Sequence, residues 1–533
     1  MFDISIRGGL IVDGSGSKPF RADIGVKDGK IAKIGAIEPK IAQTILDADG
    51  LVLSPGFVDM HSHSDFVLPA KPWAEGKLMQ GITTEVVGNC GMSAAPINPG
   101  RLDLLRSYVD FLCEEGLSWD WIGFGDYLDR LGRGGVAVNV VTLVGHNTIR
   151  TAVMGFEERA PSSQELEEMR MIVARCMVEG AFGLSSGLIY VPGIYATTEE
   201  LIELCKVASA HGGIYSSHIR GEGKELLNSV GEAASIGEGA HIPVEISHMK
   251  ASGRSNWGKV ADALKMIDDA NCRGIEITFD AYPYTAGMTT MTTLLPAWAL
   301  EGGMRELIKR LRDSQARKQI EAELRSGFSD LTRDLVSDGG ESVLIAHCRS
   351  ERNKHLEGRS LLEASRLRGL DVISIVLTLL EEEEGEASMI IFSMCEDDVR
   401  KALKHPKGMM GTDSIDISKG RAHPRAYGTC PRLLSRYVRE ERLLSLEEAV
   451  RKMTLMPAMK LGLIDRGTLK EGFWADIVAF NMDEIQDTAT YNQPNSFPRG
   501  IEYVMVNGEI AVEKGRYQRK LAGKVLKRTG VAG

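Results

Sequence analysis

Apolar and polar residues alternate over short runs at both ends of the chain. Near the N-terminus, "DISIRGGLIVDG" has this strand-like pattern, and Asp28-Gly29 separates two further strand-like runs. An Asp-Gly pair between such runs is a strong hairpin signal because the turn requires positive φ angles. Near the other end, "GTLKEGFWADIVAF" and "GIEYVMVNGEIAVEKG", which contains Asn507-Gly508, show the same pattern. We therefore predict one small β-domain assembled from residues 1–54 and 461–533.

Between these ends, residues 55–460 alternate apolar strand-like runs with amphipathic helical stretches. This βαβ pattern is typical of an α/β protein with a parallel sheet. Eight of the strand-like runs end near His63, Cys90, His146, Gly187, His218, His248, Tyr284 and Asp413. Eight strands close a (β/α)8 barrel, so we predict a TIM-like barrel.

Two more apolar runs exceed the eight that a barrel needs. They are "SVLIAHC" (342–348) and "MIIFSM" (389–394). Either one of them is the true seventh strand, or both lie in an insertion late in the barrel, at about 290–395.

Composition and charge exclude several classes of protein. Lys and Arg number 63 against 73 Asp and Glu, a net charge of −10, which gives no reason to expect nucleic acid or an acidic membrane as a partner. The eight cysteines lie far apart without C-x-x-C pairs, as is typical of reduced intracellular thiols. The N-terminal "MFDISIRGGL" lacks the apolar core of a signal peptide, and the longest apolar run, "VISIVLTLL", is too short to span a bilayer. We expect a cytoplasmic enzyme with a small-molecule partner.

Metal-ligand side chains occur where the predicted strands end. In a (β/α)8 barrel the chemistry lies at the C-terminal ends of the strands. Imidazole, thiolate and carboxylate are ligands of zinc and similar divalent metals. Alone, a strand-end histidine is usually a hydrogen-bonded polar residue, and a buried cysteine usually behaves as a small hydrophobe. Together they predict a metal site, and its candidate ligands are His61, His63, Cys90, His218, His248 and Asp413.

These residues and several longer motifs carry a family resemblance. The motifs are "GFVDMHSHSD", "GITTEVVGNCGMSAAP", "LVGHNTIR", "GAFGLSSGLIYVPG", "SHIRGEG", "ISHMKASGRSNWGK", "YPYTAG" and "GTDSIDISKGRAHPRAYGT". The chain resembles the N-acyl-D-amino-acid deacylases (D-aminoacylases) of the amidohydrolase superfamily, over nearly its whole length except about 290–385. The resemblance implies hydrolysis of the amide bond of N-acyl-D-amino acids, releasing a carboxylate and a free D-amino acid.

The resemblance also implies how metal would be held. One zinc ion would be bound tightly by Cys90, His218 and His248. A second, weaker position would use His61, His63 and Asp413. The strand "AFGLSSGLIY" contains no lysine that could be carbamylated to bridge two metals, which separates the chain from dihydroorotases and hydantoinases.

A mechanism follows from the chemistry of such a centre. A divalent cation lowers the pKa of bound water, which supplies hydroxide at neutral pH. Asp413 would take the proton as general base and pass it to the departing amine as general acid. The developing oxyanion needs a second partner besides the metal, and Tyr284 or Tyr282 could supply it. The alternative for either tyrosine is a barrel-lining aromatic.

Other residues are candidates for binding substrate. By resemblance, Lys250 and Arg425 bind the α-carboxylate, and a bidentate fork suits Arg425 to this task. Arg220 either binds an acidic side chain or forms a loop salt bridge. Ser186, with Ser185 beside it, either lines the side-chain pocket or packs.

Two rival functions fit the same residues. The first is another amidohydrolase, such as a dipeptidase acting on D-residues or a cyclic-amide hydrolase. The second is a catalytically silent barrel that serves in an assembly, which the fold tolerates. A silent barrel predicts loss of metal ligands, and all six candidate ligands are present in this chain.

Overall fold

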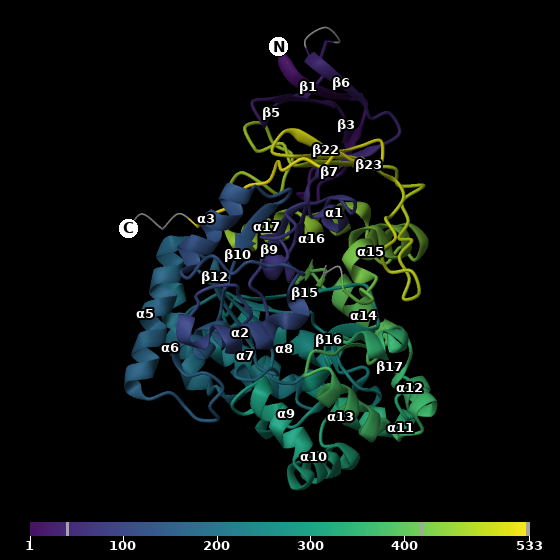
Figure 1. The fold of residues 1–533 in the computed structure, drawn as a ribbon. Helices are drawn as coiled ribbons and strands as arrows, with labels where there is room; N and C mark the ends of the chain where they lie inside the picture. Colours follow the sequence, from purple (N-terminus) through teal and green to yellow (C-terminus); the bar gives the residue numbers. More distant parts are fainter. Residues whose placement is uncertain (39–41, 416–418, 529–533) are drawn as a thin grey trace.

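The two ends of the chain meet in adjacent sheets. The structure is a computed structural model that describes residues 1–38, 42–415 and 419–528. One four-stranded sheet has the order β5-β4-β1-β6, and a seven-stranded sheet has the order β23-β22-β21-β20-β7-β2-β3. Their strands are β1 (Phe2–Arg7), β2 (Leu10–Ile11), β3 (Phe20–Arg21), β4 (Asp23–Lys27), β5 (Lys30–Gly35), β6 (Ala42–Asp47), β7 (Val52–Pro55), β20 (Ile477–Phe480), β21 (Ile501–Val506), β22 (Glu509–Glu513) and β23 (Arg516–Tyr517). Both sheets lie above the rest of the molecule in Figure 1.

Both hairpins that the sequence predicts are present. Asp28-Gly29 connects β4 to β5, and its φ angles are 52° and 76°. Asn507-Gly508 connects β21 to β22, with φ angles of 50° and 85°. Positive φ at both central residues is the geometry that matches the twist of two antiparallel strands.

Eight parallel strand positions form the barrel, as predicted. Its strands are β8 (Phe57–Asp59), β9 (Ile82–Val87), β10 (Asn139–Thr142) continued by β11 (Val144–Gly145), β12 (Gly183–Gly187), β13 (Ile214–His218), β14 (Val244–Ile246), β15 (Ile277–Ala281) and β19 (Gly408–Met410). β8, β9 and β10 pair in one sheet, and β11 to β19 pair in the other. The barrel closes where the Met60 amide donates to the Met410 carbonyl oxygen at 3.1 Å.

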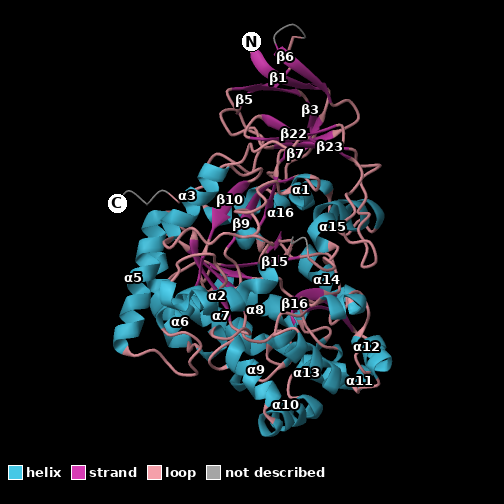
Figure 2. Cartoon of the chain, in the orientation of Figure 1, coloured by secondary structure: helices cyan, strands magenta, loops and turns pink. Residues whose placement is uncertain are grey.

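Helices surround these strands (Figure 2). They are α1 (Glu75–Leu78), α2 (Leu102–Val109), α3 (Phe124–Gly134), α4 (His146–Val153), α5 (Ser163–Glu179), α6 (Thr198–Ala210), α7 (Leu226–Ala240), α8 (Val260–Cys272), α14 (Glu396–Lys404), α15 (Arg425–Arg432), α16 (Leu446–Met453) and α17 (Leu455–Leu461). Side-chain caps fix where several begin: Thr197 accepts a hydrogen bond from the Glu200 amide at 3.2 Å, and Ser445 accepts one from the Glu448 amide.

The segment between β15 and β19 forms a separate small sheet with its own helices. β16 (Gly287–Thr290), β18 (Ser388–Ile391) and β17 (Val343–His347) pair antiparallel in that order. The accompanying helices are α9 (Met304–Arg312), α10 (Ser314–Ser326), α11 (Asp330–Asp338), α12 (Leu361–Arg368) and α13 (Val372–Glu382). Both surplus apolar runs therefore lie in the insertion, and β15 is the seventh barrel strand. The insertion helices form the lower part of the molecule in Figure 1.

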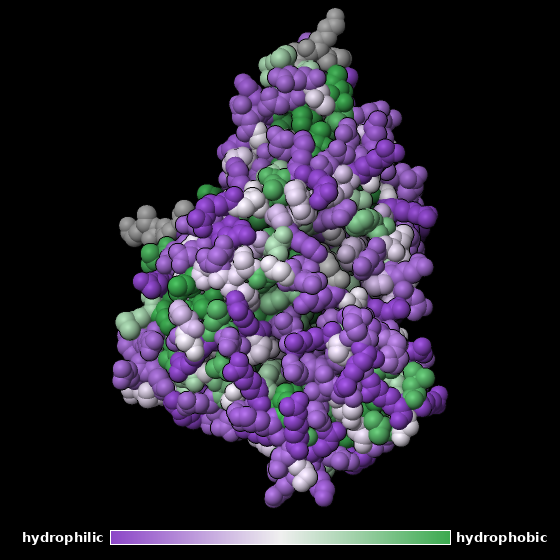
Figure 3. All heavy atoms as spheres, viewed as in Figure 1, coloured by the Kyte–Doolittle hydropathy of each residue, from purple (hydrophilic) through white to green (hydrophobic). Residues whose placement is uncertain are grey.

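The surface carries mostly hydrophilic side chains on the face drawn in Figure 3, with apolar ones in small groups. Among the described residues, no helix has the length and apolar character needed to cross a bilayer.

Candidate functional site

The six candidate ligands lie at or just beyond the C-terminal ends of barrel strands. His218 ends β13, and Cys90, His248 and Asp413 follow β9, β14 and β19 within a few residues. The last three have φ angles of 53°, 37° and 48° respectively, in the left-handed region that residues with a side chain rarely adopt. Such strained backbone concentrates at functional sites, because the surrounding structure must hold it in place.

Cys90, His218 and His248 bring three donor atoms to one point. The Cys90 Sγ lies 3.6 Å from His218 Nδ1 and 3.7 Å from His248 Nε2. In a tetrahedral zinc site with ordinary Zn–S and Zn–N bonds, sulfur and nitrogen lie about 3.6 Å apart. The three side chains are buried, and their ligand atoms all lie within 4.8 Å of one another. Spacing and donor chemistry therefore fit zinc.

His61, His63 and Asp413 form a second group beside the first. The Asp413 Oδ1 lies 3.2 Å from His63 Nε2 and 3.6 Å from His61 Nε2. The Cys90 Sγ is 3.3 Å from His61 Nε2, so the thiol also belongs to this group. The sequence placed Cys90 in one ligand set only, whereas the structure places its sulfur between both.

The electrostatics of the cluster favour ionised ligands. Burial opposes ionisation of the Cys90 thiol, but His61, His218 and His248 outweigh it and hold its pKa well below the usual value. Burial likewise opposes ionisation of Asp413, yet the Arg425 guanidinium and the nearby histidines hold the pKa of this carboxyl well below its usual range. A thiolate and a carboxylate are the forms that bind a cation.

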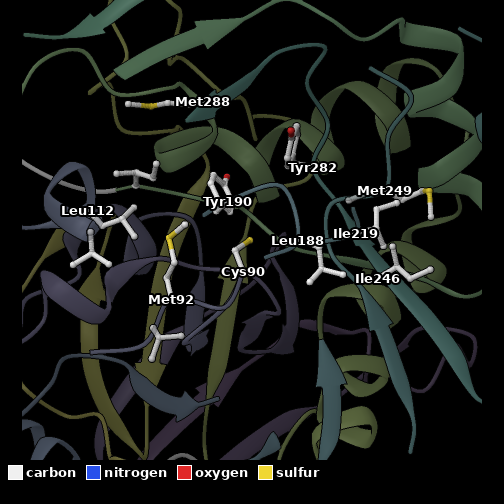
Figure 4. Packing of buried hydrophobic residues seen from close by; sticks show 14 of the residues in the cluster. Cys90, Met92, Leu112, Leu188, Tyr190, Ile219, Ile246, Met249, Tyr282 and Met288 are labelled. Carbon is white, nitrogen blue, oxygen red and sulfur yellow. The ribbon is translucent and has the colours of Figure 1, made fainter. Parts of the chain in front are cut away.

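Two cavities open beside the cluster. A small cavity of about 70 Å³ is lined by His63, His218, His248, Lys250, Tyr282 and Asp413. A larger one of about 280 Å³ shares Ile189, Tyr190 and Glu222 with it. Figure 4 shows Cys90, Tyr190 and Tyr282 in this region, with Met92 and Met288 nearby. The larger cavity is mostly apolar, and its remaining lining includes Val191, Ile194, Leu295, Leu300 and Met304.

Two of the predicted substrate-binding residues face the small cavity. The Lys250 Nζ lies 2.6 Å from His248 Nδ1 and 2.5 Å from Glu222 Oε1. Two cations lie near the Tyr282 ring: the Arg425 guanidinium carbon is 4.7 Å, and the Lys250 Nζ 5.8 Å, from its centre. The Tyr282 hydroxyl donates a weak hydrogen bond to the Met394 sulfur at 3.9 Å. Both side chains can therefore reach a molecule in this cavity.

Four other predicted residues do not line the small cavity: Arg425, Tyr284, Arg220 and Ser186. The Arg425 Nη1 pairs with Asp413 Oδ2 at 2.8 Å, so this guanidinium lies behind the carboxylate. Tyr284 directs its hydroxyl to the Pro424 carbonyl oxygen, and its ring packs on Arg432.

Arg220 and Ser186 are also occupied by protein partners. Arg220 makes a bidentate ion pair with Glu232 and donates to the carbonyl oxygens of Ile194 and Ala196. Of the two alternatives for Arg220, a bond to an acidic substrate side chain or a loop salt bridge, the structure shows the loop salt bridge. The Ser186 hydroxyl lies 2.7 Å from the Tyr215 hydroxyl, in a buried cluster that contributes to neither cavity.

The sequence analysis missed two carboxylates that contact the imidazole rings of candidate ligands. The Asp280 Oδ2 lies 3.2 Å from His61 Nδ1, while its Oδ1 accepts a hydrogen bond from the His248 amide at 3.0 Å. Glu222 Oε1 lies 3.0 Å from His248 Nδ1. A charged residue inside the apolar run "IEITFDAY" was the available signal for Asp280, because a buried charge needs a partner.

Comparisons with known proteins agree with this geometry. The amidohydrolase family matches residues 44–512. A D-aminoacylase of Alcaligenes xylosoxydans xylosoxydans is 37% identical, covering 99% of this chain and 98% of that protein. An N-acyl-D-glutamate deacylase of the same organism is 35% identical, covering 99% and 96%.

Solved structures give the same result. A D-aminoacylase crystal structure superposes with a TM-score of 0.84 at 34% identity, over 99% of this chain and 100% of the other. The N-acyl-D-glutamate deacylase of Bordetella bronchiseptica, solved with zinc and a phosphonate that mimics the tetrahedral intermediate, has the same values. An L-hydantoinase from Arthrobacter aurescens, at 18% identity and a TM-score of 0.55, covering 99% and 100%, shares the fold. With a barrel whose strand ends gather these ligands, and with relatives matched from end to end, the chain belongs to the amidohydrolase family.

Proposed function

We propose that this chain is a zinc-dependent amidase that hydrolyses N-acyl-D-amino acids to a carboxylate and a free D-amino acid. The observation that carries the proposal is the spacing of Cys90, His218 and His248, which fits one tetrahedral zinc ion. The relatives that match over the full chain are D-aminoacylase and N-acyl-D-amino-acid deacylases. His61, His63 and Asp413 are the proposed ligands of a second, weaker position beside it.

Asp413 is the proposed proton carrier. Zinc at such a centre supplies a hydroxide nucleophile by lowering the pKa of water. The Asp413 carboxylate, held ionised by Arg425 and placed beside His61 and His63, is positioned to accept the proton. Handing that proton to the amine nitrogen allows the C–N bond to break, because an amine anion is a very poor leaving group.

Lys250 and Tyr282 are the proposed partners of the substrate. Both line the small cavity with the candidate ligands. The Lys250 ammonium supplies the positive charge that a free α-carboxylate requires, and the Tyr282 hydroxyl is a hydrogen-bond donor for the carboxylate or the developing oxyanion. Arg425 supports Asp413 in this scheme, in place of the carboxylate-binding role that the resemblance implies.

The larger cavity favours substrates with apolar side chains. Its walls include Ile189, Ile194 and Leu300, and the nearest arginine, Arg220, already pairs with Glu232. An acidic side chain entering this cavity would lose hydration beside the carboxylates of Glu222, Glu225 and Asp330. The lysine of the lining, Lys224, is exposed, and water screens its charge. We therefore propose N-acyl derivatives of apolar D-amino acids as the preferred substrates.

We also propose a cytoplasmic location. All eight cysteines are free thiols, and Cys90 must stay reduced to bind zinc.

The test is a panel of N-acetyl amino acids of both hands, assayed with and without a chelator. We expect hydrolysis of N-acetyl-D-leucine and N-acetyl-D-methionine, slower turnover of N-acetyl-D-glutamate, and loss of activity with the chelator that added zinc restores. Hydantoins and D-residue dipeptides in the same panel separate the rival amidohydrolases. Hydrolysis of those compounds without action on N-acetyl-D-amino acids would overturn the proposal.

A further inference from the structure

Glu222 contacts both metal-ligand histidines and the lysine beside them. It follows β13 by four residues, and its side chain, 15% exposed, lines both cavities. A single carboxylate oxygen, Oε1, lies 2.5 Å from Lys250 Nζ, 3.0 Å from His248 Nδ1 and 3.7 Å from His218 Nε2. Three nitrogen groups of the site therefore converge on one oxygen atom.

The two histidines present opposite ring nitrogens to the thiol of Cys90. His248 directs Nε2 toward Cys90 Sγ and Nδ1 toward Glu222. His218 directs Nδ1 toward the same sulfur and Nε2 toward Glu222. A neutral histidine that gives one nitrogen to a metal carries its hydrogen on the other nitrogen, which needs an acceptor. Glu222 is placed to be that acceptor for His248, at 3.0 Å. The His218 Nε2, 3.7 Å from the same oxygen, is too far for a hydrogen bond and has no hydrogen-bond partner among the described residues.

Lys250 is a second reason why a hydrogen-bond acceptor is needed at this position. Its Nζ lies only 2.6 Å from His248 Nδ1. An ammonium group has donors only, so it cannot share a hydrogen bond with an Nδ1 that already carries hydrogen. When the Nδ1 carries hydrogen, the two groups must turn away from each other, and the Glu222 Oε1, 3.0 Å from one and 2.5 Å from the other, is an acceptor that both can reach.

We propose that Glu222 is a positioning residue that fixes the metal-binding tautomer of His248 and, with the same oxygen, holds Lys250 at the substrate cavity. The part that concerns Lys250 rests on the proposed function; the part that concerns His248 rests on the geometry of the metal ligands alone. Glu222 thus joins the metal centre to the recognition of the substrate carboxylate.

A simple ion pair would behave differently. If Glu222 served only to neutralise Lys250, zinc affinity would fall through repulsion by the unpaired ammonium alone, and Glu222→Gln combined with Lys250→Met would restore it. If Glu222 orients His248, zinc affinity must stay low in that double variant, because outer partners of this kind contribute about 10–100-fold to metal affinity.

The first measurement is zinc affinity, which needs no substrate. Glu222→Gln and the unsubstituted protein are stripped of metal and titrated with zinc against a chelating dye. We expect Glu222→Gln to bind zinc about 10–100-fold more weakly. The matched control is Glu225→Gln, which removes the same charge three residues further on, from an exposed side chain that hydrogen-bonds Asn228. Its zinc affinity should equal that of the unsubstituted protein.

The second measurement separates positioning from folding. We expect the metal-free forms of Glu222→Gln and the unsubstituted protein to have similar Tm values, and zinc to raise the Tm of the variant less. If Glu222→Gln does not fold, Glu222→Asp keeps the charge but is one methylene too short to reach both His248 and Lys250. It should then weaken zinc binding about threefold to tenfold. Unchanged zinc affinity in whichever variant folds would overturn the proposal.

The third measurement is steady-state kinetics at saturating zinc. Glu222→Gln should raise KM for an N-acetyl-D-amino acid at least tenfold, since Lys250 loses its anchor. If the unsubstituted protein hydrolyses no N-acyl amino acid, the proposed function fails, while the zinc titration still decides whether Glu222 orients His248. An unchanged KM would remove Lys250 from the proposal.

Discussion

The backbone amide of Asp413 donates a hydrogen bond to the carbonyl oxygen of His61 at 2.7 Å. This bond joins the segment after the last barrel strand, β19, to the segment after the first, β8. The same contact brings the Asp413 carboxylate to the His61 and His63 rings. The contact that joins the first and last barrel strands therefore also completes the candidate site.

Replacing Asp413 tests its proposed role in proton transfer. Cys90, His218 and His248 do not depend on it for their mutual spacing, so Asp413→Ala should retain one zinc ion per chain. We expect kcat to fall about 10²–10⁴-fold, the usual contribution of a general base. Zinc content by elemental analysis and kcat on an N-acetyl-D-amino acid are the two measurements.

Asp413→Asn is the companion variant, because it preserves the shape and removes the charge. It should be as slow as the alanine variant. Turnover within threefold of the unsubstituted protein in either variant would show that Asp413 does not carry the proton.

Replacing Cys90 tests the shared thiol. Its sulfur belongs to both groups of candidate ligands, and its pKa is held low by the surrounding histidines. Cys90→Ala should lose zinc and activity together. Cys205→Ala is the matched control, because Cys205 is equally buried but burial alone raises the pKa of its thiol far above the usual value. A Cys90→Ala protein that retains stoichiometric zinc would contradict the assignment.

The paired tyrosines give an internal comparison. Tyr282 lines the small cavity, whereas the Tyr284 hydroxyl is turned to the Pro424 carbonyl oxygen. We expect Tyr282→Phe to lower kcat/KM about 10²–10³-fold if its hydroxyl stabilises the oxyanion. Tyr284→Phe should change kcat/KM less than threefold. The reverse order of the two effects would restore Tyr284 as the catalytic partner.

Sequence pattern predicted the barrel and the grouping of the candidate ligands because both follow from local signals. Strand-end histidines and a cysteine are visible as polar residues that end apolar runs, and parallel strands bring such ends to one face. The hairpins at Asp28-Gly29 and Asn507-Gly508 are likewise local, since they depend on two residues that accept positive φ.

Residues whose role depends on distant partners were not predictable in this way. Tyr282 and Tyr284 both come after the last residue of β15. Side chains beyond the strand no longer alternate between its two faces, so the sequence does not show which tyrosine faces the cavity. Arg425 and Arg220 have the right chemistry for carboxylates, but they pair with protein carboxylates and, unlike Lys250, do not line the small cavity. Only the packed structure shows these competing partners.

A buried carboxyl within the barrel makes the free energy of unfolding depend on pH. Glu245, on β14, is 1% exposed, and its Oε1 has no hydrogen-bond partner among the described residues. Burial raises the pKa of this carboxyl from 4.5 to about 8, although the Lys460 charge opposes the rise. The folded protein therefore keeps the proton while the unfolded chain releases it between these two values. Stability from this group is complete below about pH 4.5 and is lost as pH rises through 8.

Glu245→Gln removes this titration. Each unit of pKa shift is worth about 1.4 kcal/mol, so the Tm of the variant relative to the unsubstituted protein should rise steadily between pH 5 and pH 8. Thermal unfolding at four pH values measures this difference. The control is Glu238→Gln, which removes an exposed carboxylate from helix α7, and its Tm should run parallel to that of the unsubstituted protein. A constant difference for Glu245→Gln across the range would mean that Glu245 does not retain its proton in the folded barrel.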